Sequence, residues 1–149
     1  MILPIFEWIK KYIDFKTTKI FPMQLTKDFH KSEFDSKDGS AMPDDVLQNV
    51  QKLANQLQVL RNYIGKPIYI NSGYRSPSHN KRVGGSPNSQ HLLGKAADIR
   101  VNGYTTERLA KIIESLINNG DMLQGGIGIY NRFVHYDYRR NKARWDFRK

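Results

Sequence analysis

Two histidines and one aspartate in this chain have types and a spacing that suit the binding of a metal ion. His91 and Asp98 lie in the segment HLLGKAAD, and His135 follows in the segment FVHYDY. Two imidazoles and one carboxylate suit catalytic zinc, because a tetrahedral ion with three protein ligands keeps one position open for water. Zinc lowers the pKa of such a water toward neutrality, which makes it a usable nucleophile. The three residues are therefore a candidate site for zinc-dependent hydrolysis.

The composition narrows the choice of metal ligands. The chain has 149 residues, with 4 histidines and no cysteine. The absence of cysteine excludes disulfides, cysteine-ligated zinc and thiol catalysis. Any metal ion must then be held by histidine and carboxylate side chains. Of the two remaining histidines, we expect a structural role in its loop for His79 and an ordinary role for His30.

The residues between the first two candidate ligands predict a turn that leads into a strand. Gly94 allows the chain to turn sharply, so that His91 can face back toward the strand that follows. Side chains alternate between the two faces of a strand, so Asp98 can point toward a site while Ile99 points to the opposite face.

The third candidate lies in a run that is typical of a strand, residues 133–138. On such a strand His135 and Asp137 share one face, while Val134 and Tyr136 share the other. We therefore expect one polar face that carries the site and one face that packs into the core.

The hydrophobic pattern elsewhere predicts two helices and a sheet. Apolar residues recur at spacings of three and four over residues 43–63, which is typical of an amphipathic helix that ends near Gly65. Thr105 is the expected N-cap of a second helix, which closes at Gly120. Short apolar runs predict strands over residues 67–71, 96–101, 125–130 and 133–138. We expect an α+β fold in which two main helices pack against a small, mainly antiparallel sheet.

A long polar stretch, residues 72–95, lies between the first two predicted strands. A structureless segment of this length inside a small domain is usually functional or disordered. Because it runs directly into the apolar segment 96–101, we interpret it as a functional loop.

Three motifs of the chain resemble the zinc D-alanyl-D-alanine carboxypeptidase family. They are SGYRSPSHN (72–80), SQHLLGKAADI (89–99) and GIGIYNRFVHYD (126–137), in the order in which the family has them. That family includes phage L-alanyl-D-glutamate endolysins and bacterial murein endopeptidases, and it shares its metal site with the Hedgehog signalling domain. The resemblance covers residues 24–138 and implies a Hedgehog-like peptidase fold with a Zn²⁺ site.

The resemblance also implies roles for individual residues. It makes His91, Asp98 and His135 the zinc ligands. It makes Arg75 a catalytic residue that hydrogen-bonds the substrate and steadies the oxyanion, since a fixed guanidinium stabilises developing negative charge; the alternative is a loop arginine paired with an aspartate. Ser89 is expected to contact the substrate, or else to cap its loop.

The sequence departs from the family pattern at the general base. Several relatives carry a glutamate or aspartate three residues before the last histidine ligand, where this chain has Arg132. Asp137 is the natural substitute as the catalytic base for the zinc-activated water. It is equally suited to orient a ligand histidine from behind. Both roles remain open at this point.

The charge of the chain favours an anionic partner. Lys and Arg number 24 against 14 Asp and Glu, a net charge of +10, which attracts polyanions such as a bacterial cell wall. Six basic residues lie in the segment 139–149, which is either a solvated edge or an anion-binding segment. No helix-turn-helix, zinc finger or stacking-aromatic motif supports nucleic-acid binding. The family resemblance implies a peptidoglycan peptide as the substrate, and the charge is consistent with it. A zinc-bearing cell-wall binding module without turnover is the alternative, because Arg132 stands at the usual position of the base.

We expect a single, monomeric peptidase domain over residues 1–149, made of an N-terminal extension (1–23), a family-like core (24–138) and a basic tail (139–149). The start of the chain lacks the features of a secretory signal and of a membrane-spanning segment. A short amphipathic helix over residues 4–14 would pack on the body or lie on a membrane surface. This pattern suits a phage or prophage lysin that is made in the cytoplasm and reaches the wall on lysis.

Overall fold

The computed structural model describes residues 23–149; the amphipathic helix expected at residues 4–14 lies outside them. The described helices are α2 (Asp44–Ile64), α3 (Pro77–Arg82), α4 (Thr106–Asn118) and the short 3₁₀ turns η1 (Lys31–Phe34) and η2 (Gln90–Leu93). The strands are β1 (Tyr69–Ser72), β2 (Ala96–Arg100), β3 (Gly126–Ile129), β4 (Val134–Asp137) and β5 (Ala143–Asp146). They form one sheet in the order β1-β2-β4-β3-β5, in which β5 alone runs parallel to its neighbour. The α+β prediction is confirmed.

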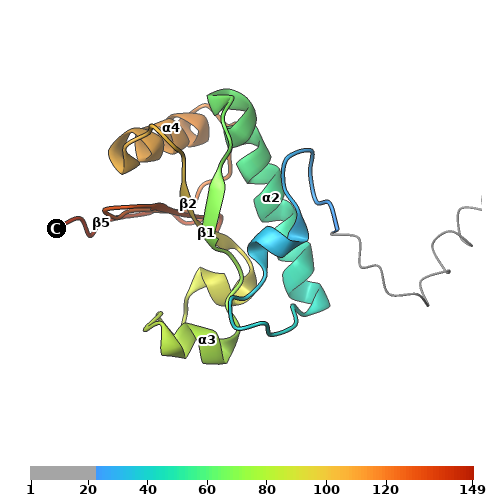
Figure 1. Cartoon of the computed structure of the whole chain (residues 1–149). Coiled ribbons are helices and arrows are strands. Elements are labelled where there is room, and N and C mark those ends of the chain that lie inside the picture. Colours follow the sequence, from blue (N-terminus) through green and yellow to red (C-terminus); the bar gives the residue numbers. More distant parts are fainter. Residues whose placement is uncertain (1–22) are drawn as a thin grey trace, which may run out of the picture.

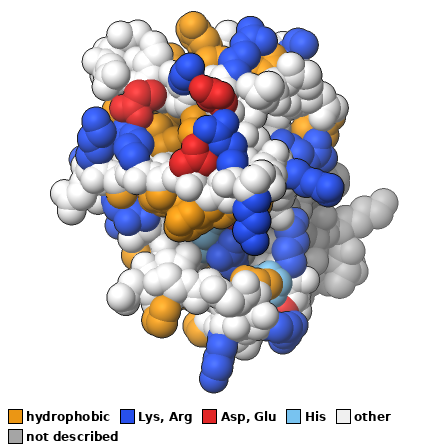
Figure 2. Space-filling view, turned by 90° about the vertical axis from the view of Figure 1, so that its left-hand side faces the viewer, with side chains coloured by type: hydrophobic (Ala, Val, Ile, Leu, Met, Phe, Trp, Pro, Cys, Tyr) orange, Lys and Arg blue, Asp and Glu red, His pale blue; other side chains and the backbone are white. Residues whose placement is uncertain are grey.

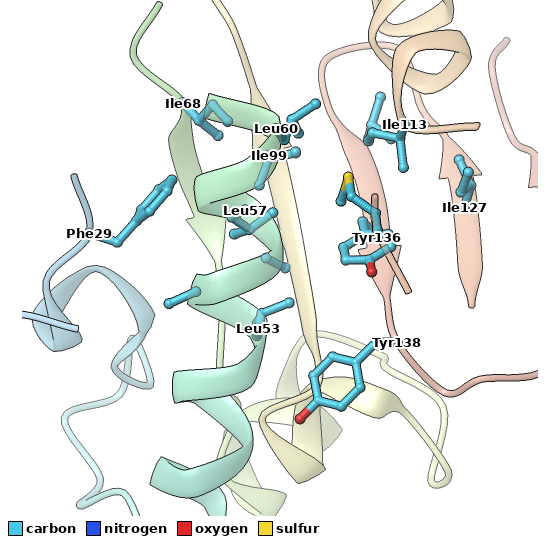
Figure 3. Packing of buried hydrophobic residues seen from close by; sticks show 14 of the residues in the cluster. Phe29, Leu53, Leu57, Leu60, Ile68, Ile99, Ile113, Ile127, Tyr136 and Tyr138 are labelled. Carbon is cyan, nitrogen blue, oxygen red and sulfur yellow. The ribbon is translucent and has the colours of Figure 1, made fainter. Parts of the chain in front are cut away.

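The two predicted main helices, α2 and α4, cover the sheet with their apolar sides. Helix α2 ends at Gly65, whose left-handed conformation (φ 71°) lets it close the helix. Helix α4 begins after Thr105, whose side chain accepts a hydrogen bond from the backbone N–H of Arg108. Figure 3 shows Leu57 and Leu60 of α2 packed over the strands.

The sheet has one face for the core and one for polar chemistry. Ile99 lies opposite Val134 across β2 and β4, and both side chains are fully buried in the core. Asp98 lies opposite His135 in the same pair of strands. Because neighbouring positions on a strand face opposite sides, these two polar residues point away from α2 and α4. Figure 1 shows α4 on one side of β5 and α3 on the other.

The polar stretch 72–95 is more ordered than the sequence suggested. It contains α3 and η2, and both begin at a serine cap: Ser76 accepts a hydrogen bond from the N–H of His79, and Ser89 from that of His91. Pro77 occupies the first position of α3, which favours a helix start. The expectation of a structureless loop was wrong, because serine caps stabilise helical turns too short to produce a hydrophobic period.

The basic C-terminal segment forms an edge strand that the sequence analysis did not identify. Strand β5 pairs with β3, and the described contacts pair several of its basic residues with acidic ones. Arg144 forms an ion pair with Glu114 of α4, and Arg148 pairs with Asp146. Segment 139–149 is thus partly built into the domain. Among residues 23–149, no helix is long and apolar enough to cross a membrane.

We expect Gly94→Ala to destabilise the protein more than Gly120→Ala, although both glycines have a left-handed backbone conformation. Gly94 has φ +71°, and a Cβ atom there would lie 2.8 Å from side-chain carbons of both Val46 and Val50 on α2. Gly120 has φ +81° but no atom within 4 Å of such a Cβ. Left-handed strain costs about 1–2 kcal/mol at both positions, and overpacking adds about 1–3 kcal/mol at Gly94 alone.

Urea unfolding of the two alanine variants measures the difference in the free energy of unfolding. A larger loss for Gly94→Ala than for Gly120→Ala is expected. Equal losses would show that η2 does not depend on close contact with α2.

Candidate metal centre

The structure brings the three predicted ligands together from three elements. His91 comes from η2, Asp98 from β2 and His135 from β4, and each offers one donor atom within 4.8 Å of the others. Asp98 Oδ1 lies 3.2 Å from His91 Nε2 and 3.0 Å from His135 Nδ1. The three residues are only 2%, 5% and 7% exposed, respectively. They form a compact buried cluster at the polar face of the sheet.

Two of the donors are placed by strand pairing and the third by a turn. Asp98 and His135 are direct cross-strand partners, and such partners have Cβ atoms about 5 Å apart on the same face. His91 reaches them because the chain turns through Gly94 between η2 and β2. The sequence-based expectations for Gly94 and for the face of Asp98 are both confirmed.

A backbone carbonyl sets the tautomer of His91. Its Nδ1 lies 2.7 Å from the carbonyl oxygen of Gly73, which can only accept a hydrogen bond. Nδ1 therefore carries the proton, and the lone pair of Nε2 points to the cluster. Residue 73 must be glycine for its backbone to lie this close to Phe34, because a Cβ atom there would be 2.7 Å from the Cα of Phe34.

A buried carboxylate holds His135 in the same way. The Nε2 of His135 lies 2.7 Å from Asp137 Oδ2, which leaves Nδ1 toward Asp98. Burial lowers the pKa of His135, but the hydrogen bonds to Asp137 and Asp98 outweigh it and raise the pKa above its ordinary value. A metal ion at Nδ1 would displace the proton that this pKa favours.

The geometry supports the orienting role of Asp137 rather than the role of general base. Asp137 is fully buried and touches the side of the His135 ring that faces away from the cluster. Its two oxygens accept further hydrogen bonds from the backbone N–H of Gly126 and from the backbone and guanidinium of Arg139. A carboxylate with all its acceptor sites filled has no place for a proton from an attacking water. The catalytic role predicted for Asp137 is therefore not supported.

Arg75 is paired with an aspartate, and that aspartate belongs to the cluster. The Nη2 of Arg75 lies 3.1 Å from Asp98 Oδ2, and the Nε of Arg75 donates a hydrogen bond to Ser72 Oγ at 3.1 Å. A third contact joins Nη1 to Asn80 Oδ1 at 3.4 Å. The alternative considered for Arg75, pairing with an aspartate, is thus observed. Because the side chain also lines the cleft, its role toward a substrate stays a prediction.

Asp98 remains a carboxylate in this environment. Burial raises its pKa, but the hydrogen bond from His135 and the two neighbouring imidazoles reverse this and hold the pKa well below the usual range. An ionised oxygen beside two imidazole nitrogens is a donor set suited to zinc.

The cluster forms the floor of a cleft of about 760 Å³. One wall is made of small and polar residues of the segment 83–90, including Ser89, whose observed hydrogen bond is the cap of η2. The other wall is aromatic and is made of Tyr130, Phe133, Trp145 and Phe147. Figure 2 shows this side of the molecule, where hydrophobic and basic side chains meet around a hollow in which histidine is visible.

The sequence analysis did not identify Phe133, Trp145, Phe147 or Arg139 as cleft residues. Trp145 lies on β5 and Phe147 directly follows it, in a segment that the sequence analysis treated as a basic tail. Arg139 appeared only as one of several basic residues in the tail. The signal that would have found them is a repeat of aromatic residues at alternate positions, Trp145 and Phe147, next to a strand rich in glycine.

A comparison with known families agrees with this site. A profile of the peptidase M15 family matches residues 23–137, which include all three cluster residues. The chain belongs to this family of peptidases. Over 83 residues it is also 35% identical to the zinc D-Ala-D-Ala carboxypeptidase of Streptomyces albus G. That match covers 54% of this chain but 31% of the relative, so the chain spans less than a third of the relative's length.

We expect Asp137→Asn to weaken zinc binding by about 10- to 100-fold, the usual effect of losing the partner of a ligand histidine. The amide can present its N–H₂ to His135 Nε2 and so favour the wrong tautomer. Asp146→Asn is the matched control, because it removes the same charge from an exposed position that pairs with Arg148.

Competition with a zinc-selective fluorescent chelator measures both affinities. An unchanged affinity for Asp137→Asn would show that the histidine is held in place without this carboxylate.

Proposed function

We propose that this protein is a zinc peptidase that hydrolyses an amide bond in the peptides of bacterial peptidoglycan. The observation that carries the proposal is the buried cluster of His91, Asp98 and His135 at the floor of an open cleft. The name of the Streptomyces albus G relative, a zinc D-Ala-D-Ala carboxypeptidase, supports both the metal and the type of substrate.

Different residues of the cleft would bind the metal ion and contact the substrate. Bound zinc would supply a Lewis acid and lower the pKa of a water molecule. The zinc ion would be held by Nε2 of His91, Nδ1 of His135 and a carboxylate oxygen of Asp98. The three side chains are held in place by hydrogen bonds to the Gly73 carbonyl, Asp137 and Arg75, respectively. Arg75 borders the cleft beside Asp98. Its guanidinium is suited to donate to the substrate carbonyl oxygen as negative charge develops there.

The proposal also includes a contact between Ser89 and the substrate, and a way for the protein to reach the cell wall. Ser89 lines the cleft within reach of a peptide, in addition to capping η2. A net charge of +10 would hold the protein on a polyanionic wall. We propose a lysin that acts as a monomer, is made in the cytoplasm and reaches the wall on lysis.

One feature favours a second candidate function, a zinc-bearing module that binds the wall without turnover. Among residues 23–149, Asp98 is the only carboxylate that lines the cleft. Arg132, at the position where several relatives carry the base, is exposed and does not line it. A cleft without a free carboxylate lacks the usual proton acceptor for hydrolysis.

Digestion of purified peptidoglycan by the zinc-loaded protein distinguishes the two. We expect soluble fragments, identified by mass spectrometry, whose masses name the bond that is cut. His91→Ala removes one donor and is expected to release none, while Asp146→Asn, outside the cleft, is expected to release as much as the unchanged protein.

Zinc binding and wall binding without any fragment would favour the binding module. Fragments that persist in His91→Ala would contradict the metal site.

A further inference from the structure

One row of side chains crosses the whole polar face of the sheet, directly beside the residues of the metal cluster. It begins on β1, where Tyr69 is the direct partner of Arg100 on β2. The pairing of Asp98 with His135, continued by two residues, sets Arg100 beside Phe133, which directly precedes β4. Because side chains two residues apart on a strand share a face, Arg100 and Phe133 lie on the same face as Asp98 and His135.

The row continues over the other half of the sheet. The N–H of Tyr130, directly after β3, donates a hydrogen bond of 3.1 Å to the carbonyl of Phe133, and the two rings stack with centroids 4.4 Å apart. The parallel register of β3 with β5 sets Phe147 beside Tyr130, and these two rings meet edge-on at 5.7 Å. We call the five side chains the aromatic row: Tyr69, Arg100, Phe133, Tyr130 and Phe147.

The aromatic row is most exposed at its two ends. Phe147 is 63% exposed and Tyr69 is 42% exposed, whereas Tyr130 and Phe133 are half-buried between them. Tyr130, Phe133 and Phe147 line the cleft above the metal cluster, but Tyr69 and Arg100 lie outside its lining. The row therefore starts in the cleft and extends beyond it over β2 and β1. A continuous exposed aromatic surface of this kind marks a binding surface.

Arg100 adds hydrogen-bond donors to an otherwise apolar row. Its Cζ lies 4.4 Å from the centroid of the Tyr69 ring, so the guanidinium packs on this ring. Its Nη1 donates a hydrogen bond of 3.1 Å to Asn102 Oδ1, and among residues 23–149 no carboxylate forms an ion pair with it. A guanidinium carries five N–H donors, so several of them are left for a ligand that lies along the row.

We propose that the aromatic row is a carbohydrate-binding surface, which holds a stretch of the glycan strand of peptidoglycan while a peptide attached to that strand enters the cleft. The inference rests on the proposed peptidase function and adds a binding site for the sugar part of the substrate. A pyranose ring has a face of C–H groups that packs on an aromatic ring, and a rim of hydroxyl and acetamido oxygens that accept hydrogen bonds from donors such as Arg100. OB-folds likewise bind oligosaccharides on the face of a sheet.

The length of the row suits an oligosaccharide rather than a single sugar. Tyr69 lies on one edge strand of the five-stranded sheet, and Phe147 directly follows the other edge strand. Neighbouring strands are about 4.8 Å apart, so a row over five strands spans about 19 Å. A ligand that contacts both ends must run across the strands and pass beside the metal cluster. Binding should therefore strengthen as sugars are added, until the ligand spans the row.

Two observations favour a neutral polysaccharide over a nucleic-acid strand. Single-stranded nucleic acids bind where a positively charged groove follows the phosphates beside the stacking rings, but Arg100 is the only basic residue of the aromatic row. The row also shares three of its rings with the cleft, so a ligand on the row lies next to the group that occupies the metal cluster. A glycan strand that carries peptides meets both conditions.

Binding of peptide-free sugar oligomers tests the aromatic row without any need for turnover. Linear oligomers of N-acetylglucosamine, from the disaccharide to the hexasaccharide, carry neither a peptide nor a charge. Two-dimensional NMR of the isotope-labelled full chain, loaded with zinc, gives the dissociation constant of each oligomer and shows which backbone amides respond. A thymidine oligonucleotide is the comparison ligand for a nucleic acid.

We expect the hexasaccharide to bind about tenfold more tightly than the disaccharide, as additional ring contacts provide. Tyr69→Ala should weaken the hexasaccharide about fivefold, whereas Tyr69→Phe keeps the ring and should retain the affinity. Tyr63→Ala is the matched control, because it removes an exposed tyrosine from α2 on the core side of the sheet. Arg100→Gln should weaken binding about threefold. Its control is Arg108→Gln, which removes a guanidinium that packs on Tyr104 away from the row.

Several results would overturn the carbohydrate surface. They are no binding of the hexasaccharide, affinities that do not depend on oligomer length, a loss in Tyr63→Ala as large as that in Tyr69→Ala, or responding amides that lie away from the row. Tighter binding of the oligonucleotide than of the hexasaccharide at the same amides would also overturn it and assign the row to a nucleic acid. Glycan binding without peptidoglycan hydrolysis would support the surface and contradict the peptidase proposal, while hydrolysis without glycan binding would contradict the surface alone.

Discussion

The pairing of β2 with β4 in a single register is the constraint on which the rest of the structure depends. This register places Asp98 opposite His135 on the polar face and Ile99 opposite Val134 in the core. A slip by one residue would turn the two donors away from each other and bring apolar side chains to the cleft. The core packing under α2 and α4 therefore does more than stabilise the fold, since it also fixes the distance between two of the three donor atoms.

Around that pair, each donor group is held from behind by a group of opposite hydrogen-bonding character. The carbonyl of Gly73 accepts a hydrogen bond from His91, the carboxylate of Asp137 accepts one from His135, and Arg75 donates to the outer oxygen of Asp98. Such buried polar groups would be costly without partners. Because each one is satisfied, one nitrogen of each histidine and one oxygen of the aspartate are left directed at a common point.

The sequence predicted what depends on local pattern and missed what depends on contacts between distant segments. Hydrophobic period and capping residues identified α2, α4 and four of the strands, and strand alternation identified the faces of Asp98 and His135. Strand β5 was missed because its alternation of Ala143, Trp145 and Phe147 lies in a segment rich in basic residues, and its parallel pairing with β3 joins segments that are not neighbours along the chain. The burial of Asp137 was missed for a related reason: alternation indicates which face a side chain occupies, but not that Arg139 and Gly126 enclose it there.

The central claim is that one zinc ion binds at His91, Asp98 and His135. Anomalous diffraction at the zinc absorption edge, from crystals of the zinc-loaded protein, tests it most directly. The account predicts one strong peak per chain, bonded to Nε2 of His91, a carboxylate oxygen of Asp98 and Nδ1 of His135, at the distances of about 2.0–2.2 Å that zinc takes with nitrogen and oxygen. A peak elsewhere in the molecule, or coordination through Nε2 of His135 with Asp137 displaced from that ring, would contradict it.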